Sequence, residues 1–202
     1  MIIKTSDFFK SAVVKKDYPK EGFPEIAFAG KSNVGKSSLI NTILNRKRLA
    51  KTSSTPGRTQ LINYFLINKS FFFVDLPGYG FAKVSKQKKK SWGKMVEDYL
   101  KDNENLRCVI LILDIRRLIQ EDDYLLIDFL YSHDIDVLFV MTKTDKVSKN
   151  ELFKQKAKLR KSLGDFYDEE KFMLFSSLTK KGKSDVLKKI GQYLSCDAHQ
   201  SS

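Results

Sequence analysis

The chain has 202 residues, of which 42% are apolar and 30% charged, with 10 glycines and 4 prolines. This length and composition predict one globular domain with a core of its own and exclude disordered, collagen-like and low-complexity classes. The 37 Lys and Arg residues exceed the 24 Asp and Glu residues, which leaves a formal net charge of +13. Such an excess favours an anionic partner, either nucleic acid or an acidic membrane surface, and we favour nucleic acid. The alternative is a merely soluble basic protein.

Nothing in the sequence points to secretion or to a membrane. The two cysteines, Cys108 and Cys196, are too few for a disulfide framework. The first ten residues contain no long apolar stretch and no cleavage site. No apolar run approaches the roughly 18 residues that a membrane-spanning helix needs. We therefore expect a cytoplasmic protein that does not bind membranes.

Strand-like apolar runs alternate along the chain with segments of helical periodicity. Strands are expected at 24–29, 61–67, 71–75, 109–113, 137–141 and 172–175, with a hairpin turn at 68–70. Helices are expected at 37–44, 92–100, 124–130, 152–163 and 186–194. This order predicts an α/β three-layer sandwich around a mostly parallel six-stranded sheet with one antiparallel edge strand. We expect an N-terminal extension at 1–22, one domain at 23–195 and a flexible tail at 196–202.

A phosphate-binding loop follows the first predicted strand. Residues 30–37 read Gly-Lys-Ser-Asn-Val-Gly-Lys-Ser and match G-x-x-x-x-G-K-[ST] at every fixed position. The glycines let backbone N–H groups surround the phosphates at the helix N-terminus. Lys36 can reach the β- and γ-phosphates, and the Ser37 hydroxyl can bind Mg2+. A chance glycine loop is the alternative, and the flanking strand and helix argue against it.

Three further motifs distinguish a GTPase from an ATPase or a kinase. Asp75-Leu-Pro-Gly78 follows a strand, where the carboxylate can hold Mg2+ through water and the glycine N–H can meet the γ-phosphate. In Thr142-Lys-Thr-Asp145, the final carboxylate can accept hydrogen bonds from guanine N1–H and N2–H, which adenine does not offer. Lys143 can lie along the base. Ser176-Ser-Leu178 follows the last strand, where a backbone N–H can bind guanine O6.

The four motifs lie at the ends of successive predicted strands, where an open α/β sheet binds its ligand. Together they resemble the TRAFAC class of GTPases, which implies a Ras-like fold. Thr142 stands where most relatives carry asparagine, so its hydroxyl must tie the base loop to the phosphate loop. The segment 54–60 occupies the place of the first switch loop and contains Thr55 and Thr59. We choose Thr59 as a Mg2+ ligand because it immediately precedes a strand, and an ordinary turn is the alternative.

A narrower resemblance rests on Thr55-Pro-Gly-Arg-Thr-Gln60 and Asp75-Leu-Pro-Gly-Tyr-Gly80, together with the phosphate loop and Thr142-Lys-Thr-Asp145. In these residues and in its length, the chain resembles the EngB family, also called YsxC or YihA. The resemblance implies a bacterial GTPase needed for assembly of the large ribosomal subunit, with links to normal septation and cell division.

The motifs predict one nucleotide site, with no residue assigned as general base. The expected catalytic residues are Lys36, Thr59 and Gly78, which would position the phosphates and the attacking water. The expected Mg2+ ligands are Ser37 and Thr59, with Asp75 acting through water. The residues expected to bind the nucleotide are Gly30, Lys31, Ser32, Asn33, Val34, Gly35, Lys36, Ser37, Ser38, Gly57, Arg58, Thr59, Gln60, Leu61, Asp75, Leu76, Pro77, Gly78, Thr142, Lys143, Thr144, Asp145, Ser176, Ser177 and Leu178.

Tyr79 follows the D-x-x-G motif, where Ras-like enzymes carry a glutamine that orients the attacking water. A tyrosine cannot do this in the same way, so we predict slow intrinsic hydrolysis that a partner or a cation completes. Asn33 lies where related GTPases carry an asparagine that helps to bind K+, and the resemblance implies K+ as a second cofactor. The alternative is that Asn33 is a structural loop residue.

Basic residues gather where contact with RNA could respond to the nucleotide. The segment 83–94 follows D-x-x-G, has no acidic residue and is accompanied by the aromatic residues Phe81 and Trp92. Its expected RNA contacts are Lys83, Lys86, Lys88, Lys89, Lys90 and Lys94. A second face that could bind the RNA backbone carries Lys154, Lys156, Lys158, Arg160 and Lys161. For the segment 83–94 a solvated helix start is the alternative, and for Arg116-Arg117 a solvated pair is favoured over contact with phosphate or RNA.

We therefore predict a monomeric GTPase that binds GTP, GDP and Mg2+ and hydrolyses GTP slowly. Its nucleotide state is expected to gate contact with the large ribosomal subunit and its rRNA. One rival is a signalling or cell-division GTPase that acts on a protein without RNA. Another is a non-enzymatic RNA-binding module with a vestigial nucleotide site. A phosphate-loop kinase would prefer ATP, and Thr142-Lys-Thr-Asp145 argues against it.

Overall fold

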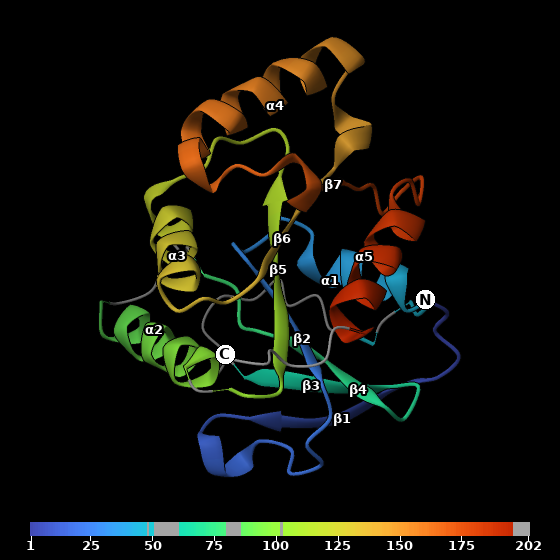
Figure 1. Cartoon of the computed structure of the whole chain (residues 1–202), viewed down its shortest axis with the longest axis vertical. Coiled ribbons are helices and arrows are strands. Elements are labelled where there is room, and N and C mark those ends of the chain that lie inside the picture. The colour runs from blue at the N-terminus through green and yellow to red at the C-terminus, as the bar shows by residue number, and fades with distance from the viewer. Residues whose placement is uncertain (48, 51–60, 80–85, 102, 196–202) are drawn as a thin grey trace.

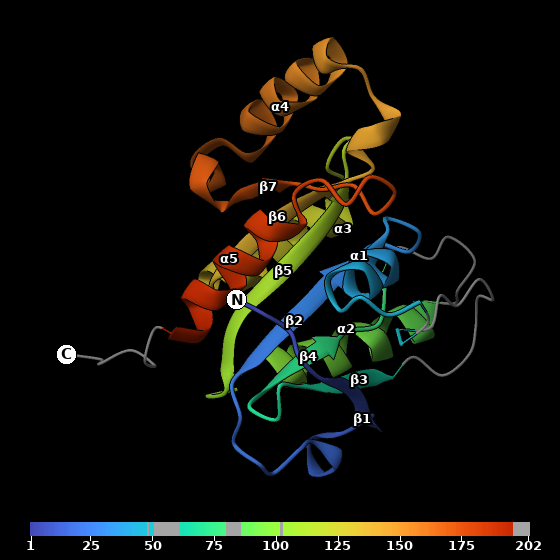
Figure 2. The ribbon, with the colours of Figure 1, turned by 90° about the vertical axis from the view of Figure 1, so that its right-hand side faces the viewer.

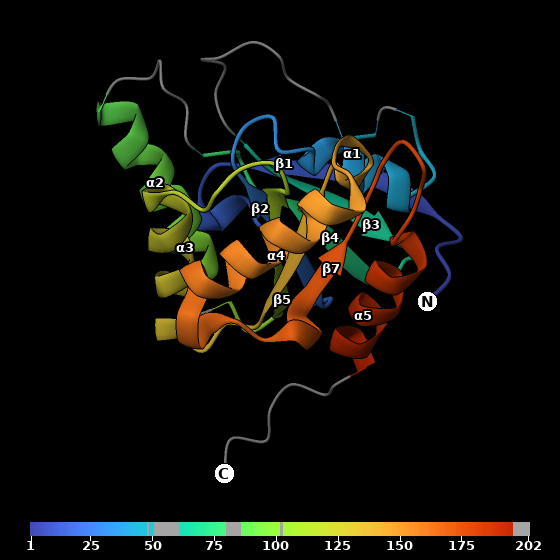
Figure 3. The same cartoon turned by 90° about the horizontal axis from the view of Figure 1, so that it is seen from above.

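A computed structural model describes residues 1–47, 49–50, 61–79, 86–101 and 103–195, with the backbone alone at 86–92. Its centre is a seven-stranded sheet in the order β1-β3-β4-β2-β5-β6-β7. Helices α1 and α5 cover one face of this sheet, and α2 and α3 cover the other (Figures 1 and 3). The three-layer α/β sandwich that the sequence predicts is therefore confirmed.

Continuous apolar runs form the central strands, as expected for strands that are covered on both faces. The strands are β1 (Ser6–Ala12), β2 (Glu25–Gly30), β3 (Ile62–Ile67), β4 (Phe71–Asp75), β5 (Leu106–Asp114), β6 (Val137–Thr142) and β7 (Phe172–Leu174). Strand β2 pairs in parallel with β4 and β5, and β5, β6 and β7 continue the parallel sheet. Strand β3 is antiparallel to both of its neighbours. The carboxyl ends of the five parallel strands consequently share one edge.

Five α-helices are found within the described residues, close to the positions predicted from periodicity. They are α1 (Lys36–Ile43), α2 (Lys86–Leu100), α3 (Glu121–Ser132), α4 (Lys149–Leu163) and α5 (Lys183–Ser195). Helix α4 begins with a capping box, in which Ser148 Oγ accepts from the Glu151 amide at 3.2 Å and the Glu151 carboxylate accepts from the Ser148 amide at 2.8 Å. A second capping box, formed by Gln120 and Asp123, begins α3.

Two apolar cores lie on the two faces of the sheet. One joins α2 and α3 to the sheet through Tyr99 and Ile127, and Leu159 of α4 belongs to it. The other joins α1 and α5 to the sheet through Ile40 and Ile190. Figure 2 shows α5 and α1 side by side over the sheet, with α4 standing beyond it. Both faces of the sheet are therefore covered by apolar side chains.

The sheet has one strand more than the sequence predicts, because residues 6–12 of the expected extension form β1. It pairs with β3 from Ser6 opposite Ile67 to Ala12 opposite Ile62. A shift in register between Phe8 and Lys10 breaks the alternation that would have revealed the strand. Strand β1 is therefore the edge strand, and the antiparallel β3 lies inside the sheet. The expected tail at 196–202 lies outside the described residues.

Candidate functional site

The sequence motifs converge on the carboxyl-terminal edge of the parallel strands. The phosphate loop joins β2 to α1, and the D-x-x-G segment follows β4 next to it. The T-K-x-D and S-S-L segments follow β6 and β7 on the other side. This is the edge at which an open α/β sheet holds its ligand.

The phosphate loop enters α1 through a glycine that the backbone requires. Gly35 has φ +107°, and a Cβ there would lie 3.4 Å from Thr142 Oγ1. The loop then presents Lys36, whose ammonium pairs with the Asp75 carboxylate. The Lys36 and Asp75 side chains are only 12% and 8% exposed. The group expected to bind phosphate and the group expected to hold Mg2+ therefore face the same point.

The D-x-x-G segment docks directly on the phosphate loop. The Tyr79 amide donates to the Gly30 carbonyl at 3.3 Å, and the Ser32 amide donates to the Tyr79 carbonyl at 3.0 Å. A Cβ on Gly78 would lie 3.2 Å from Ser32 Oγ. A side chain at Gly78 would thus require Ser32 Oγ to shift by a few tenths of an ångström.

The Tyr79 side chain points away from this contact, toward the start of α3. It is 3% exposed, and its hydroxyl donates to Asp123 Oδ1 at 2.8 Å. Burial, together with the Asp123 charge, raises the pKa of Tyr79 well above its usual value, so the phenol stays neutral. Lys31 adds a hydrogen bond of 2.5 Å to Gln120 at the same helix start. Motif spacing did not reveal this link, because its members are distant in sequence.

The base-binding loops are tied to the phosphate loop and to each other. Thr142 Oγ1 donates to the Val34 carbonyl, which is the contact expected of this hydroxyl. Ser176 Oγ donates to Asp145 Oδ1 at 2.7 Å. This hydrogen bond is the main cause that lowers the pKa of Asp145, so the carboxylate is ionised at neutral pH. An ionised Asp145 can accept the two guanine N–H bonds.

The S-S-L loop depends on a close backbone approach at Gly182. This residue has φ +80°, and a Cβ would lie 1.8 Å from the Leu174 carbonyl oxygen. The Ser176 amide donates to the Lys181 carbonyl at 3.1 Å, which closes the loop. The Leu178 side chain is 73% exposed. This side chain therefore lies on the surface of the loop and not in the core.

Several predicted site residues lie outside the described residues. They are Gly57, Arg58, Thr59 and Gln60 of the first switch loop, and Lys83 of the basic segment. The side chains of Lys86, Lys88, Lys89 and Lys90 are likewise not described, whereas Lys94 is exposed on α2. Leu61 is half-buried just before β3.

The described donors suit Mg2+, which prefers hard oxygen ligands. Ser37 supplies a hydroxyl oxygen and Asp75 a carboxylate oxygen at the same end of the phosphate loop. Among the described residues, no group of three or more His, Cys, Asp or Glu side chains could hold a metal. Ser37 and Asp75 are therefore the candidate Mg2+ residues, and Thr59 lies outside the residues that the structure describes.

The second basic face is partly engaged within the molecule. The Lys156 ammonium pairs with Glu169, and the Arg160 guanidinium lies 5.9 Å from the centre of the Tyr167 ring. Among the other cations of α4, Lys154, Lys158 and Lys161 are exposed. They recur at helical spacing and so form one stripe on the outer side of α4.

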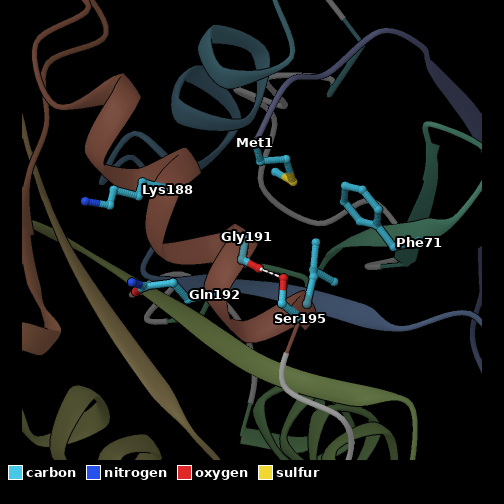
Figure 4. Close-up of a pocket in the computed structure, with 7 residues that line it drawn as sticks. Met1, Phe71, Lys188, Gly191, Gln192 and Ser195 are labelled. Atoms are coloured by element: carbon cyan, nitrogen blue, oxygen red, sulfur yellow. Dashed lines mark hydrogen bonds between the residues drawn. The ribbon is translucent and has the colours of Figure 1, made fainter.

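A groove of about 570 Å³ lies away from all these motifs. It runs beside the end of α5 and is bordered by Met1 and Phe71 (Figure 4). Lys188 is the one charged side chain among its lining residues. No residue of the phosphate loop or of the other three motifs lines it, so it is not part of the nucleotide site.

None of the helices within the described ranges combines the length and apolar character needed to cross a bilayer.

Comparison with known proteins decides the family. Residues 25–143 match the family of 50S ribosome-binding GTPases. The chain is 53% identical over 190 residues to the probable GTP-binding protein EngB of Geobacter metallireducens, covering 94% of this chain and 92% of the relative. The chain belongs to the EngB family. The EngB relative from Clostridium kluyveri is 53% identical over 188 residues, covering 93% and 95% of the two chains.

Solved structures agree with the EngB fold. A crystal structure of a probable GTP-binding protein EngB has a TM-score of 0.66 at 24% identity and covers 84% of this chain and 98% of its own. The Era protein of Aquifex aeolicus, bound to GDP and aluminium fluoride, has a TM-score of 0.65 at 22% identity and covers 86% and 57%. The resemblance to EngB noted in the sequence is confirmed, and the chain is a GTP-binding member of a ribosome-binding GTPase family.

Proposed function

We propose that this chain is a slow GTPase whose nucleotide state gates its association with the large ribosomal subunit during assembly. The observation that carries the proposal is the direct bonding of the phosphate loop to both neighbouring loops. Ser32 contacts Tyr79 on the switch side, and Val34 contacts Thr142 on the base side. A change at the phosphates can therefore reach the segment that follows Tyr79. That segment contains the basic residues expected to contact rRNA.

The proposed chemistry follows from the groups around Lys36. Its ammonium would leave Asp75 for the β- and γ-phosphates, and Asp75 would then hold a water of the Mg2+ ion. Mg2+ would neutralise charge on the phosphates when bound. The Tyr79 hydroxyl is bonded to Asp123, so it is not available to orient an attacking water. This arrangement supports slow intrinsic hydrolysis, which a partner or K+ near Asn33 would accelerate.

Two lysine surfaces would contact rRNA. The first is the segment 83–94, which contains Lys94 of α2, and the second is the outer stripe of α4 formed by Lys154, Lys158 and Lys161. Contacts to phosphates would add affinity that falls as salt rises. We propose that the protein acts as a cytoplasmic monomer, and that its loss would disturb septation through deficient subunit assembly.

The test is co-sedimentation with purified large subunits in a non-hydrolysable GTP analogue, GDP or no nucleotide, at two salt concentrations. Analogue-dependent association that weakens with salt is expected. Charge reversal of Lys86, Lys88 and Lys90 should abolish it, and reversal of Lys154, Lys158 and Lys161 should weaken it. Equal or absent association in every nucleotide state would overturn the proposal and favour a GTPase that acts on a protein partner without RNA.

A further inference from the structure

Asp114 belongs to none of the four sequence motifs, yet it lies between two of them. It ends β5, which is flanked by β2 and its phosphate loop on one side and by β6 and its T-K-x-D loop on the other. The side chain of Asp114 is fully buried. Its position at the edge that carries the nucleotide motifs raises the question of what a buried carboxylate does there.

The Asp114 carboxylate pairs with three cations, of which Arg116 and Lys143 are the closest, while Arg117 Nε lies 4.0 Å from Oδ2. Arg116 donates to Oδ1 through Nε at 2.9 Å and to Oδ2 through Nη2 at 2.7 Å. The Lys143 ammonium lies 2.9 Å from Oδ2. Burial by itself would raise the pKa of Asp114, but the hydrogen bonds from Arg116 and Lys143 outweigh it and hold that pKa well below its usual value. Asp114 is therefore a charged partner of Lys143 at any pH at which the protein is used.

Lys143 is held at two points. Its ammonium also donates to the Asn33 carbonyl of the phosphate loop at 2.7 Å. Its backbone has φ +61°, a left-handed conformation that a lysine adopts only when its surroundings impose it. The Lys143 side chain consequently reaches from the base loop to the phosphate loop, and its ammonium is fixed by both Asn33 and Asp114. Asp145, which is expected to read guanine, lies two residues further along the chain.

We propose that Asp114 is a positioning residue of the nucleotide site, which holds the Lys143 side chain in place as one wall of the guanine pocket. The inference rests on the proposed role of Lys143 beside the base. A buried ion pair is by itself weak evidence for added stability, because the desolvation of both ions offsets their attraction. Preorganisation of Lys143 gives such a pair a reason to exist, since an ordered side chain loses no freedom when the nucleotide binds.

The consequence concerns how long the nucleotide stays bound. Without the carboxylate, Lys143 keeps only its bond to Asn33 and must be ordered again at each binding event. GDP and GTP would both dissociate faster, because they share the guanine ring. Hydrolysis of GTP that is already bound would not change, since Asp114 contacts neither Lys36 nor Asp75.

Asp114→Asn in the full chain tests this role, because the amide keeps the shape and loses the charge. Release of a fluorescent GDP, chased with unlabelled GDP, should become about tenfold faster, while single-turnover hydrolysis of bound GTP stays within twofold of the wild-type rate. Arg116→Gln is the matched control, because it removes a partner of Asp114 and leaves the pair with Lys143. Its release rate should stay within about threefold of wild type.

A double variant separates positioning from a general effect on the fold. In a Lys143→Met background, Asp114→Asn should cause no further acceleration, because its effect passes through the ammonium. If Asp114→Asn does not fold, Asp114→Glu takes its place in the test. This variant keeps the charge one methylene further out and should release GDP at an intermediate rate. Wild-type release in both Asp114 variants, or a tenfold effect that persists with Lys143→Met, would overturn the inference. Failure of the wild-type protein to bind guanine nucleotides would instead refute the site itself.

Discussion

The Thr142 hydroxyl donates a hydrogen bond to the Val34 carbonyl and thereby joins the base loop to the phosphate loop. The same oxygen lies 3.1 Å from the Leu113 carbonyl, so the hydroxyl sits between β5 and the phosphate loop. Thr142 is 1% exposed, and water cannot replace it there. One short side chain therefore aligns the two loops that would hold opposite ends of a nucleotide.

Removal of this hydroxyl should loosen both loops. Thr142→Val keeps the shape but leaves the buried Val34 carbonyl without its partner, which costs about 1–3 kcal/mol. We expect a lower free energy of unfolding and an affinity for GDP that is weaker by about tenfold, measured by thermal melting and by titration with fluorescent GDP. Thr142→Ser retains the hydroxyl and should stay close to wild type. Equal affinities for all three proteins would refute the alignment role.

The Ser176 hydroxyl should set the acid limit of guanine binding. Its bond lowers the pKa of Asp145, and a lowered pKa keeps the carboxylate ionised until the pH falls through that value. Ser176→Ala would let the pKa rise toward the usual 3.8, so binding would be lost at a higher pH than in wild type. Titrations with fluorescent GDP between pH 3.5 and 7 would measure this. Superimposable pH profiles would contradict the prediction.

The hydroxyl of Tyr79 should matter for stability and not for hydrolysis. Tyr79→Phe removes a hydrogen bond to the charged Asp123, which is worth roughly 1.5–3 kcal/mol, or several degrees in melting temperature for a chain of this size. Single-turnover hydrolysis should remain within twofold of wild type. Tyr124→Phe is the matched control, because that exposed hydroxyl donates to the Ser162 carbonyl. A tenfold loss of hydrolysis in Tyr79→Phe would mean that the phenol acts on the attacking water.

Buried Glu25 should make stability fall as the pH rises. It is 4% exposed and accepts from the Tyr99 hydroxyl at 2.7 Å and from Asn103 Nδ2 at 3.1 Å. Burial raises its pKa above the usual 4.5, and the two hydrogen bonds only partly oppose this. The folded protein therefore holds the proton more tightly than the unfolded chain, and stability is lost as the pH increases from about 4.5 through the raised value.

Glu25→Gln removes this titration and keeps an oxygen that accepts the same hydrogen bonds. The melting temperature of the variant, relative to wild type, should increase between pH 4.5 and pH 7.5. Glu104→Gln, an exposed substitution, serves as control. If the melting temperatures of Glu25→Gln and wild type change with pH in parallel over this range, the pKa of Glu25 is the same in the folded and the unfolded protein.

Much of the fold could be predicted because local patterns and burial agree. The runs at 109–113 and 137–141 are apolar at nearly every position, and both became central strands. The edge strand β1 escaped prediction, because Phe8 is 53% exposed and a register shift interrupts its alternation. An edge strand depends on its neighbour, here β3, more than on its own residues.

The motif residues of the site could be located from spacing, but their connections could not. Phosphate-loop and T-K-x-D residues are defined by their order after strands, and the sheet brings them to one edge. Asp114 and Asp123 carry no motif, and their roles depend on contacts with Lys143 and Tyr79 that lie 29 and 44 residues away in sequence. Arg116 is exposed, as expected of a solvated residue, but its bond to Asp114 through two nitrogens could not be read from the sequence.

The most direct test of nucleotide-gated association changes the base specificity of this site, so that the protein binds a nucleotide that other GTPases do not use. Asp145→Asn replaces an acceptor with a group that can donate to O2 of xanthine, so the variant should prefer xanthosine nucleotides. Co-sedimentation of this variant with large ribosomal subunits should require a non-hydrolysable xanthosine triphosphate analogue and ignore the GTP analogue, while wild type shows the reverse. Association of the variant that is indifferent to the xanthosine analogue, despite measured binding of that analogue, would contradict gating by this site.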